Sequence, residues 1–283
     1  MVTADTHDRV PANRSAGRSA MAEYQRRRQL YAAERGDSSR RVAVTAAAAA
    51  VGASVLVGFL CGAAGLSAGR VVQGAVLAAL AVLGAVAVRY YRVPPEIEAW
   101  RVDAEAERRT ARSLDRLSRA GYTVLHDRQL ADSAGNIDHL VIGPSGAWVI
   151  ETDAHRGPLR QNAAGVWVGK VPLRAMLGLV TWMGEEATSQ LVTELPAGWQ
   201  LEAQPVVAFA RTDVPNGLAL VEGVLLLPLA GIADYILSAG VVLRPIDVAL
   251  LVDVAERVLP GYEVAGPPPA WPTRSRLRGM LRR

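Results

Sequence analysis

Two long runs without charged residues constrain this chain more than any other feature. Residues 42–66 carry no charged side chain, and residues 71–88 form a second uncharged run in which Gln73 is the only strongly polar member. A helix of about 20 apolar residues is long enough to span the hydrocarbon core of a bilayer. The two runs therefore predict a transmembrane hairpin over residues 42–91, closed by a short turn at residues 67–70.

A signal peptide and a soluble helical hairpin are the alternatives to membrane spans for these two runs. A signal peptide does not account for the first run, because the run starts some forty residues into the chain and exceeds the usual apolar region of a signal. A buried helical hairpin of a soluble protein stays an alternative, since both runs are rich in Ala. Gly58 and Gly62 have the spacing that lets two membrane helices approach closely and form a homo-oligomer, although small residues are common here.

Arginines set the expected orientation. They are concentrated before the first run and after the second, and only Arg70 lies between the runs. The positive-inside rule then puts both flanks, and with them both termini and the remaining chain, in the cytoplasm. The preference for Arg over Lys and the abundance of Ala indicate a GC-rich genome, so the expected location is the inner membrane of a bacterial cell.

The rest of the chain divides by composition into four segments. Residues 1–41 are basic and polar and are expected to be mostly disordered with one short helix. Residues 92–99 form a linker stiffened by two prolines, and residues 100–260 carry alternating helix and strand patterns typical of one α/β domain. Residues 261–283 are rich in Pro and Arg and are expected to be a flexible tail. The basic ends would attract nucleic acid or anionic lipid, although the arginines before the membrane already serve as a topology signal.

A β-hairpin is expected in the middle of this domain. The β-type runs 137–142 and 147–152 flank the turn sequence Gly-Pro-Ser-Gly at residues 143–146. With a two-residue turn, facing residues have numbers that add to 289, which puts Asp138 opposite Glu151. A three-residue loop would shift this pairing by one position.

Acidic side chains gather at the open end of the hairpin. Because side chains alternate along a strand, Asn136, Asp138, Glu151 and Asp153 share one face. Like charges that face each other on a sheet are destabilising, so the arrangement favours a bound cation or proton. Mg²⁺ fits because it takes oxygen ligands, and Mn²⁺ is an alternative. If this end is solvated, the carboxylates merely keep it soluble.

The same residues carry a family resemblance. NIDHLVIGPSG, then WVIET and HRG, is similar to the nuclease-related domain, NERD, of the PD-(D/E)XK nuclease-like superfamily. The resemblance implies a mixed sheet flanked by helices and a catalytic metal bound by Asp138 and Glu151. It also implies a helical acidic residue, best matched by Glu107. Where the family pattern has Lys this chain has Asp153, which would make a third metal ligand or mark loss of catalysis.

Three further residues complete the expected site. Lys170, the only lysine of the chain, would supply the missing cation. Arg156 would contact a substrate phosphate, and Asn136 is expected beside the substrate. No phosphate-binding loop, hydrolase elbow or zinc-protease motif occurs, and the single Cys61 excludes a disulfide framework.

The sequence therefore predicts a membrane-anchored protein that resembles a metal-dependent nuclease acting on DNA. The alternative is a catalytically inactive, membrane-tethered module that binds nucleic acid or a protein. A third interpretation, an assembly scaffold built on the helical hairpin, requires no site.

Overall fold

The computed structural model describes residues 15–131, 135–162 and 165–262. They form two compact units: one comprises residues 24–98, and the other joins the chain up to Glu23 with the chain from Ala99 onward. The expected tail over residues 261–283 lies outside the described residues, apart from Gly261 and Tyr262.

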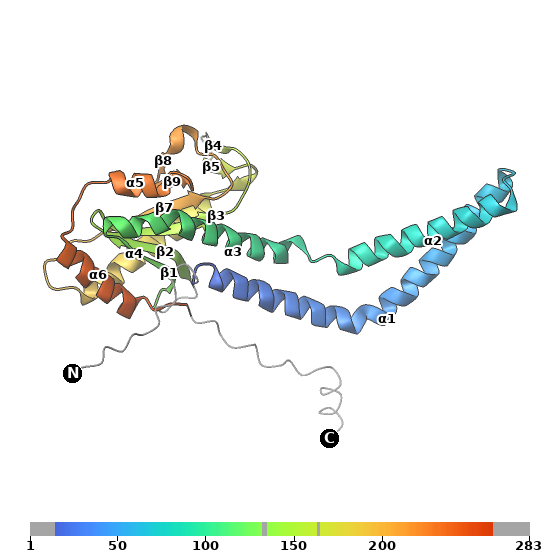
Figure 1. The fold of residues 1–283 in the computed structure, drawn as a ribbon, viewed down its shortest axis with the longest axis horizontal. Helices are drawn as coiled ribbons and strands as arrows, with labels where there is room; N and C mark the ends of the chain where they lie inside the picture. The colour runs from blue at the N-terminus through green and yellow to red at the C-terminus, as the bar shows by residue number, and fades with distance from the viewer. Residues whose placement is uncertain (1–14, 132–134, 163–164, 263–283) are drawn as a thin grey trace, which may run out of the picture. The chain divides into compact units, whose positions relative to one another are not determined.

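The smaller unit is built on two long helices, labelled α1 and α2 in Figure 1. Helix α1 covers Arg18–Ala63, so its first turns belong to the larger unit, and α2 covers Ala68–Tyr91. The stretches Ser38–Ala63 and Ala68–Tyr91 are long and apolar enough to cross a membrane, with mean hydropathies of 2.1 and 2.4. The Ser54 hydroxyl donates to the Ala75 carbonyl oxygen at 3.0 Å, so the two helices pack closely there.

The segment before the first apolar run differs from the expectation of disorder. Helix α1 already begins at Arg18 and continues without interruption into the apolar part. Residues 18–35 are rich in Ala, Arg, Glu and Gln, which are strong helix formers, and the apolar helix that follows removes the cost of a separate nucleation. Residues 1–14 lie outside the described part of the chain.

The larger unit contains a six-stranded mixed sheet with the order β1-β2-β3-β7-β9-β8. The first three strands are antiparallel, β3, β7 and β9 are parallel, and β8 is an antiparallel edge strand. The strands are β1 (Thr123–Gln129), β2 (Asn136–Gly143), β3 (Gly146–Asp153), β7 (Ala203–Phe209), β8 (Ala219–Val221) and β9 (Val224–Pro228). A separate three-stranded sheet contains β4 (Leu159–Asn162), β5 (Gly165–Val168) and β6 (Val171–Pro172).

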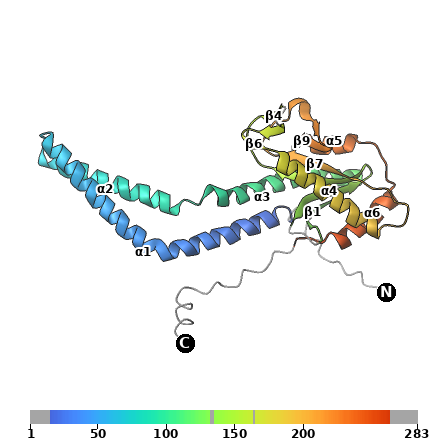
Figure 2. The ribbon, with the colours of Figure 1, turned by 180° about the vertical axis from the view of Figure 1, so that it is seen from behind.

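Helices cover both faces of the six-stranded sheet, as a comparison of Figures 1 and 2 shows. One face packs on α4 (Arg174–Glu194) and α6 (Pro245–Val258), with Leu140 and Val149 meeting Met183 and Leu251. The other face packs on the end of α3 (Pro95–Leu114), on the short helix η2 (Asp115–Ala120) and on α5 (Ile232–Ser238). This is the mixed α/β architecture expected from the sequence.

The register of the β2–β3 hairpin is the one that the two-residue turn predicts. Gly143 pairs with Gly146, and the pairing continues to His139 opposite Ile150, so facing residue numbers add to 289. The Ser145 hydroxyl in the turn accepts hydrogen bonds from the Tyr122 hydroxyl at 2.9 Å and from Trp148 Nε1 at 3.1 Å. A Cβ at Gly143 would lie 2.0 Å from the Tyr122 ring, so this position requires glycine. The turn thereby fixes which side chains reach the open end.

Candidate functional site

A cavity of about 460 Å³ lies at the open end of the hairpin. Its acidic lining includes Glu107 from α3, Asp138 from β2 and Glu151 from β3. Asp103, Asn136, Thr152, Asp153 and His155 also line it, and Ser19, Ala20 and Glu23 of α1 form one wall. The first turns of α1 are therefore part of the site, although no feature of the sequence indicated this.

The hairpin ladder ends at the carboxylates. Beyond the pair His139 and Ile150, the Asp138 carboxylate accepts a hydrogen bond from the backbone N–H of Thr152, with Oδ2 2.9 Å from the nitrogen. The Asp138 side chain thus takes the place of the next backbone partner between the two strands. Asp138 is 7% exposed and Glu107 is 5% exposed, so both carboxyl groups lie in a largely desolvated environment.

Burial and neighbouring carboxylates raise the pKa of all three carboxyl groups. The pKa of Asp138 is raised to about 8, chiefly by burial; the hydrogen bond from the Thr152 N–H lowers it, and the charges of Asp127 and Asp103 add to the increase. Burial and then the charge of Asp138 hold the pKa of both Glu107 and Glu151 well above the ordinary range. Glu107 Oε2 and Glu151 Oε2 are buried without a hydrogen-bond partner. Such atoms are costly in a folded protein and indicate a missing proton or cation.

Asp127 adds a negative charge that the residue pattern did not reveal. It lies on β1, next to the pairs His126–His139 and Arg128–Ile137, so it is beside Asp138 in the neighbouring strand. Its carboxylate accepts hydrogen bonds from Arg18 N at 2.7 Å, Ser19 Oγ at 2.5 Å and Asn136 Nδ2 at 2.9 Å. Asp127 caps the start of α1 and thereby holds that helix against the cavity. The pairing of β1 with β2 would have revealed this neighbour, but the sequence of residues 130–135 does not define one register between the two strands.

Asp153 stands in the place of the family's Lys, and both of its carboxylate oxygens bind His155. Its side chain is fully buried, and its two oxygens lie 2.8 Å from the backbone nitrogen and from the Nδ1 of His155. The His155 side chain is 48% exposed at the cavity. Asp153 therefore orients an imidazole, and His155 is the only basic side chain among the described residues that line the cavity.

The remaining predicted residues divide into two groups. Asn136 lines the cavity and donates to Asp127 and to the Ser19 hydroxyl. Lys170 is exposed in the tight turn between β5 and β6, and Arg156 is exposed on the segment leading to β4, so neither lines the cavity. The separate small sheet carries both residues away from the hairpin end, which the sequence pattern did not distinguish from a continuation of the main sheet.

A buried polar chain connects the hairpin to α3. His126 Nδ1 and His139 Nδ1 lie 2.7 Å apart, and His139 Nε2 lies 3.4 Å from Thr152 Oγ1. Thr152 Oγ1 donates to Thr110 Oγ1 at 3.0 Å, and Thr110 is one turn beyond Glu107 on α3. Burial lowers the pKa of His126 to about 4 and that of His139 well below its ordinary value. The pair is therefore neutral at pH 7, and it helps to fix α3 against β3.

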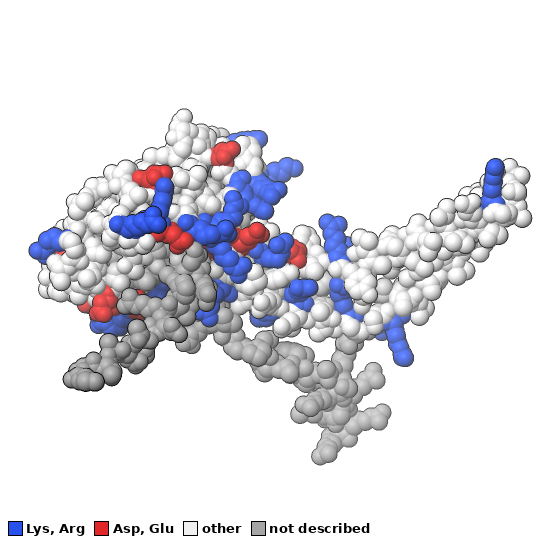
Figure 3. Space-filling view, in the orientation of Figure 1, with Lys and Arg blue, Asp and Glu red and all other residues white. Residues whose placement is uncertain are grey.

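A second cavity, of about 600 Å³, lies at the same edge of the sheet. It follows the ends of β7 and β9, and Arg109, Arg112 and Arg211 are among its lining residues. It adjoins the acidic cavity, because the Thr212 hydroxyl donates to the His155 carbonyl oxygen at 3.0 Å. Figure 3 shows Lys and Arg side chains gathered along α3 on this face. An acidic and a basic cavity thus lie next to each other.

The acidic cavity suits a hard divalent cation by its chemistry. It offers carboxylate oxygens, two of which have no partner, and a double positive charge would lower the raised pKa values. Within the described ranges, no group of three or more His, Cys, Asp or Glu side chains is already arranged to hold a metal ion. Binding would therefore require the carboxylates of Glu107, Asp138 and Glu151 to adjust their side-chain positions.

Comparison with known proteins gives one match. Residues 103–210 match the model of the nuclease-related domain, NERD. The matched segment contains Glu107, Asp138, Glu151, Asp153 and His155, and it excludes the first turns of α1. No curated protein and no solved structure matches the chain.

Proposed function

Because the chain contains a nuclease-related domain at residues 103–210, we propose that it is a membrane-anchored, metal-dependent nuclease that acts on DNA. The observation that carries this proposal is the convergence of Glu107, Asp138 and Glu151 in one cavity, with an unpartnered buried oxygen on each of the two glutamates. Buried carboxylates without partners are retained at a cost in stability, and a metal-dependent site gives a reason for that cost.

Glu107, Asp138 and Glu151 would hold Mg²⁺ or Mn²⁺. When bound, the ion would activate a water molecule and neutralise charge on the scissile phosphate. Asp153 takes no part as a ligand in this proposal, because both of its oxygens are engaged by His155. From the sequence, Asp153 was expected either to be a third metal ligand or to mark loss of catalysis, and this proposal gives it a different role.

His155 takes the role of the family's lysine. Asp153 accepts a hydrogen bond from the N–H at His155 Nδ1, which leaves Nε2 as the atom that takes up a proton. As the water oxygen bonds to phosphorus, the water proton moves to His155 Nε2. The P–O bond to the leaving oxygen breaks, and that oxygen keeps the electron pair and is protonated from solvent. Lys170 and Arg156, which do not line the cavity, have no part in this step.

The basic cavity would bind the phosphates next to the scissile one. Arg109, Arg112 and Arg211 line it, and guanidinium groups bind phosphate oxygens through paired hydrogen bonds. The attraction between these arginines and the DNA phosphates would offset the repulsion between DNA and the acidic cavity. Phosphate contacts of this kind carry no sequence preference, so binding is expected to depend strongly on salt and weakly on sequence.

The two apolar helices would anchor the enzyme in a membrane. The proposed orientation puts both termini and the nuclease-related domain in the cytoplasm of a bacterial cell, because arginines are concentrated before the first apolar stretch and after the second. Close approach of small residues on these helices would also permit a homo-oligomer.

The test uses the full chain in detergent, because the first turns of α1 line the site and a shortened domain would lack them. Cleavage of labelled single- and double-stranded DNA is measured with Mg²⁺, with Mn²⁺ and with a chelator, and metal binding is followed by calorimetry. We expect metal-dependent cleavage that Asp138→Ala abolishes and Lys170→Ala leaves unchanged. Metal-independent cleavage, or cleavage that survives Asp138→Ala, would contradict the proposal.

The second candidate is a catalytically inactive module that binds nucleic acid or a protein beside the membrane. The replacement of the family's lysine by Asp153 favours it, because no Lys or Arg is then among the described residues that line the cavity. DNA binding with metal binding but no cleavage of either DNA form would support this candidate over the nuclease.

A further inference from the structure

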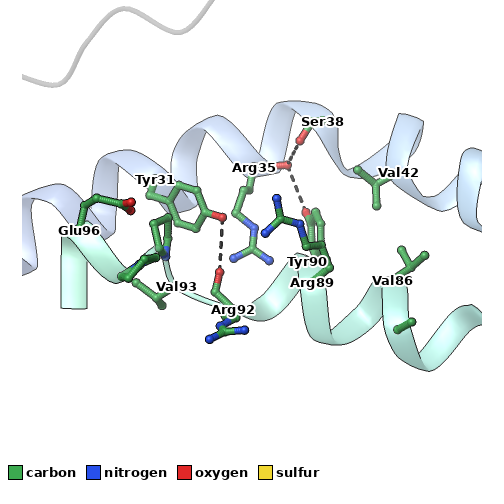
Figure 4. A pocket seen from close by; sticks show the side chains of 13 residues that line it. Tyr31, Arg35, Ser38, Val42, Val86, Arg89, Tyr90, Arg92, Val93 and Glu96 are labelled. Carbon is green, nitrogen blue, oxygen red and sulfur yellow. Dashed lines mark hydrogen bonds between the residues drawn. The ribbon is translucent and has the colours of Figure 1, made fainter. Parts of the chain in front are cut away.

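The smaller unit contains a cavity of about 850 Å³ between α1 and the end of α2, shown in Figure 4. Its polar lining includes Tyr31 and Arg35 of α1 and Arg89, Tyr90 and Arg92 at the end of α2. Glu96 is the only acidic residue among its described lining residues, so three arginines face one glutamate. The cavity is therefore suited to an anion.

Arg35 is held in the cavity by aromatic rings. Its guanidinium carbon lies 4.1 Å from the ring centre of Tyr90, 5.0 Å from that of Tyr31 and 5.7 Å from that of Tyr91. The Tyr90 hydroxyl also donates to the Arg35 carbonyl oxygen at 3.1 Å, an interaction drawn in Figure 4. Cation–π contacts fix the guanidinium without using its N–H donors.

One of these donors has no acceptor. Arg35 Nη2 is buried and has no hydrogen-bond partner in the described part of the chain. A buried charged donor without an acceptor is costly, so the aromatic enclosure stabilises a group whose hydrogen-bonding capacity is left over for another molecule. An oxyanion is the ligand that satisfies this donor.

The cavity is polar at one end and apolar at the other. Arg35 precedes the apolar stretch Ser38–Ala63 by three positions, and Arg92 directly follows the stretch Ala68–Tyr91. Beyond the arginines, the lining continues with Val42 and Val86, which belong to the apolar stretches. Tyr and Arg side chains are typical of the level at which lipid headgroups meet the hydrocarbon core.

We propose that this cavity binds the headgroup of an anionic phospholipid, whose phosphate accepts a hydrogen bond from Arg35 Nη2. Arg89 adds positive charge to the same cavity, and the acyl chains lie along Val42 and Val86. The proposal rests on membrane insertion of α1 and α2, which is part of the proposed function, and it is independent of nuclease activity. A free phosphate shares the headgroup chemistry but makes no use of the apolar end.

The experiment measures the thermal unfolding of the full chain in a neutral detergent. Dioctanoyl phosphatidylglycerol, dioctanoyl phosphatidylcholine and inorganic phosphate are added in parallel. We expect phosphatidylglycerol alone to raise the Tm. Arg35→Gln should weaken its apparent affinity about tenfold or more, the loss expected when a charged hydrogen bond is removed. The control Arg41→Gln alters an exposed arginine of α1 that does not line the cavity, and it should keep the wild-type response.

The remaining outcomes distinguish a lipid site from weaker forms of binding. An equal Tm increase with inorganic phosphate would replace the lipid by a free oxyanion. An equal loss in Arg41→Gln would mean general attraction between arginines and anionic lipid, and it would overturn the specific site. Arg35→Lys keeps the charge but loses the planar donors, so a wild-type response in this variant would also overturn it. Vesicle flotation tests insertion separately: failure to float removes the membrane anchor, whereas flotation without lipid preference removes only the headgroup site.

Discussion

Ser19 Oγ lies 2.5 Å from Asp127 Oδ1, so a residue at the start of α1 is tied to a carboxylate beside the candidate site. The same carboxylate accepts a hydrogen bond from Arg18 N at 2.7 Å. A Cβ at Gly17 would lie 2.6 Å from the Ala104 carbonyl oxygen, which shows how closely the start of α1 approaches α3. The helix that forms a wall of the acidic cavity therefore depends on a few polar contacts.

Ser19→Ala should loosen the first turn of α1. Loss of a helix-capping contact costs about 1 kcal/mol, so we expect amide hydrogen exchange in residues 18–22 to become about fivefold faster. The control Ser39→Ala removes an exposed hydroxyl of the same helix, which donates to the Gly36 carbonyl oxygen one turn earlier. Equal exchange in wild type and Ser19→Ala would show that the Asp127 contact does not hold the helix.

Asp138→Asn should stabilise the protein when no divalent ion is present. The pKa of Asp138 is raised from its ordinary value of 3.8 to about 8, so between these values the folded state binds more protons than the unfolded state. Wild-type stability therefore falls as the pH rises toward 8, whereas the amide carries no charge to desolvate. We expect Asp138→Asn to be about 1–3 kcal/mol more stable at pH 8.5, measured by denaturant unfolding in chelator.

The same variant should lose the response to Mg²⁺. In wild type we expect Mg²⁺ to raise the Tm, and to do so more at pH 8.5 than at pH 6.5, because protons compete with the ion for these carboxylates. Asp138→Asn should show no increase at either pH. A Mg²⁺ effect of equal size in both proteins would exclude Asp138 as a ligand.

The buried histidine pair predicts acid sensitivity with the opposite sign. The pKa of His126 is lowered from 6.5 to about 4, so between these values the unfolded chain binds more protons than the folded protein. The contribution of His126 to stability is therefore lost as the pH falls below 6.5, by about 1–3 kcal/mol. The NMR signals of His126 and His139 should stay at their neutral positions down to pH 5, and an imidazolium signal from either residue at pH 6 would contradict the neutral pair.

Residue pattern predicted the part of the site that depends on local structure. The turn at residues 143–146 sets the hairpin register, the register brings Asp138 and Glu151 together, and Glu107 follows from the helical resemblance. Asp127 and the wall formed by α1 depend on contacts between residues over a hundred positions apart, which periodicity does not report. Lys170 and Arg156 do not line the cavity, and strand propensity does not reveal this, because it does not show that β4 and β5 form their own sheet.

Arg211→Gln should weaken DNA binding without a sequence effect. Arg211 lines the basic cavity beside the acidic one, and each phosphate contact that is lost reduces the salt dependence of the binding constant by about one unit of slope. The control Arg160→Gln alters an exposed arginine on β4 that lines neither cavity. If the slope of log binding constant against log salt is the same for Arg211→Gln and wild type, this cavity does not bind DNA phosphate.

His155→Ala should remove the group that takes up the water proton while leaving metal binding intact. Loss of general base catalysis costs about 10²–10⁴-fold in kcat, and we expect this loss with little change in KM or in the calorimetric affinity for Mg²⁺.

Asp153→Asn should also lower kcat. The amide no longer provides a charged acceptor for the hydrogen bond from His155 Nδ1, although the side chain keeps nearly the same volume. Asp153→Lys would put a charge on a fully buried position that now holds His155, so it should destabilise the protein rather than restore the family's lysine. Full cleavage by His155→Ala, or a gain of activity in Asp153→Lys, would show that the Asp153–His155 pair does not replace that lysine.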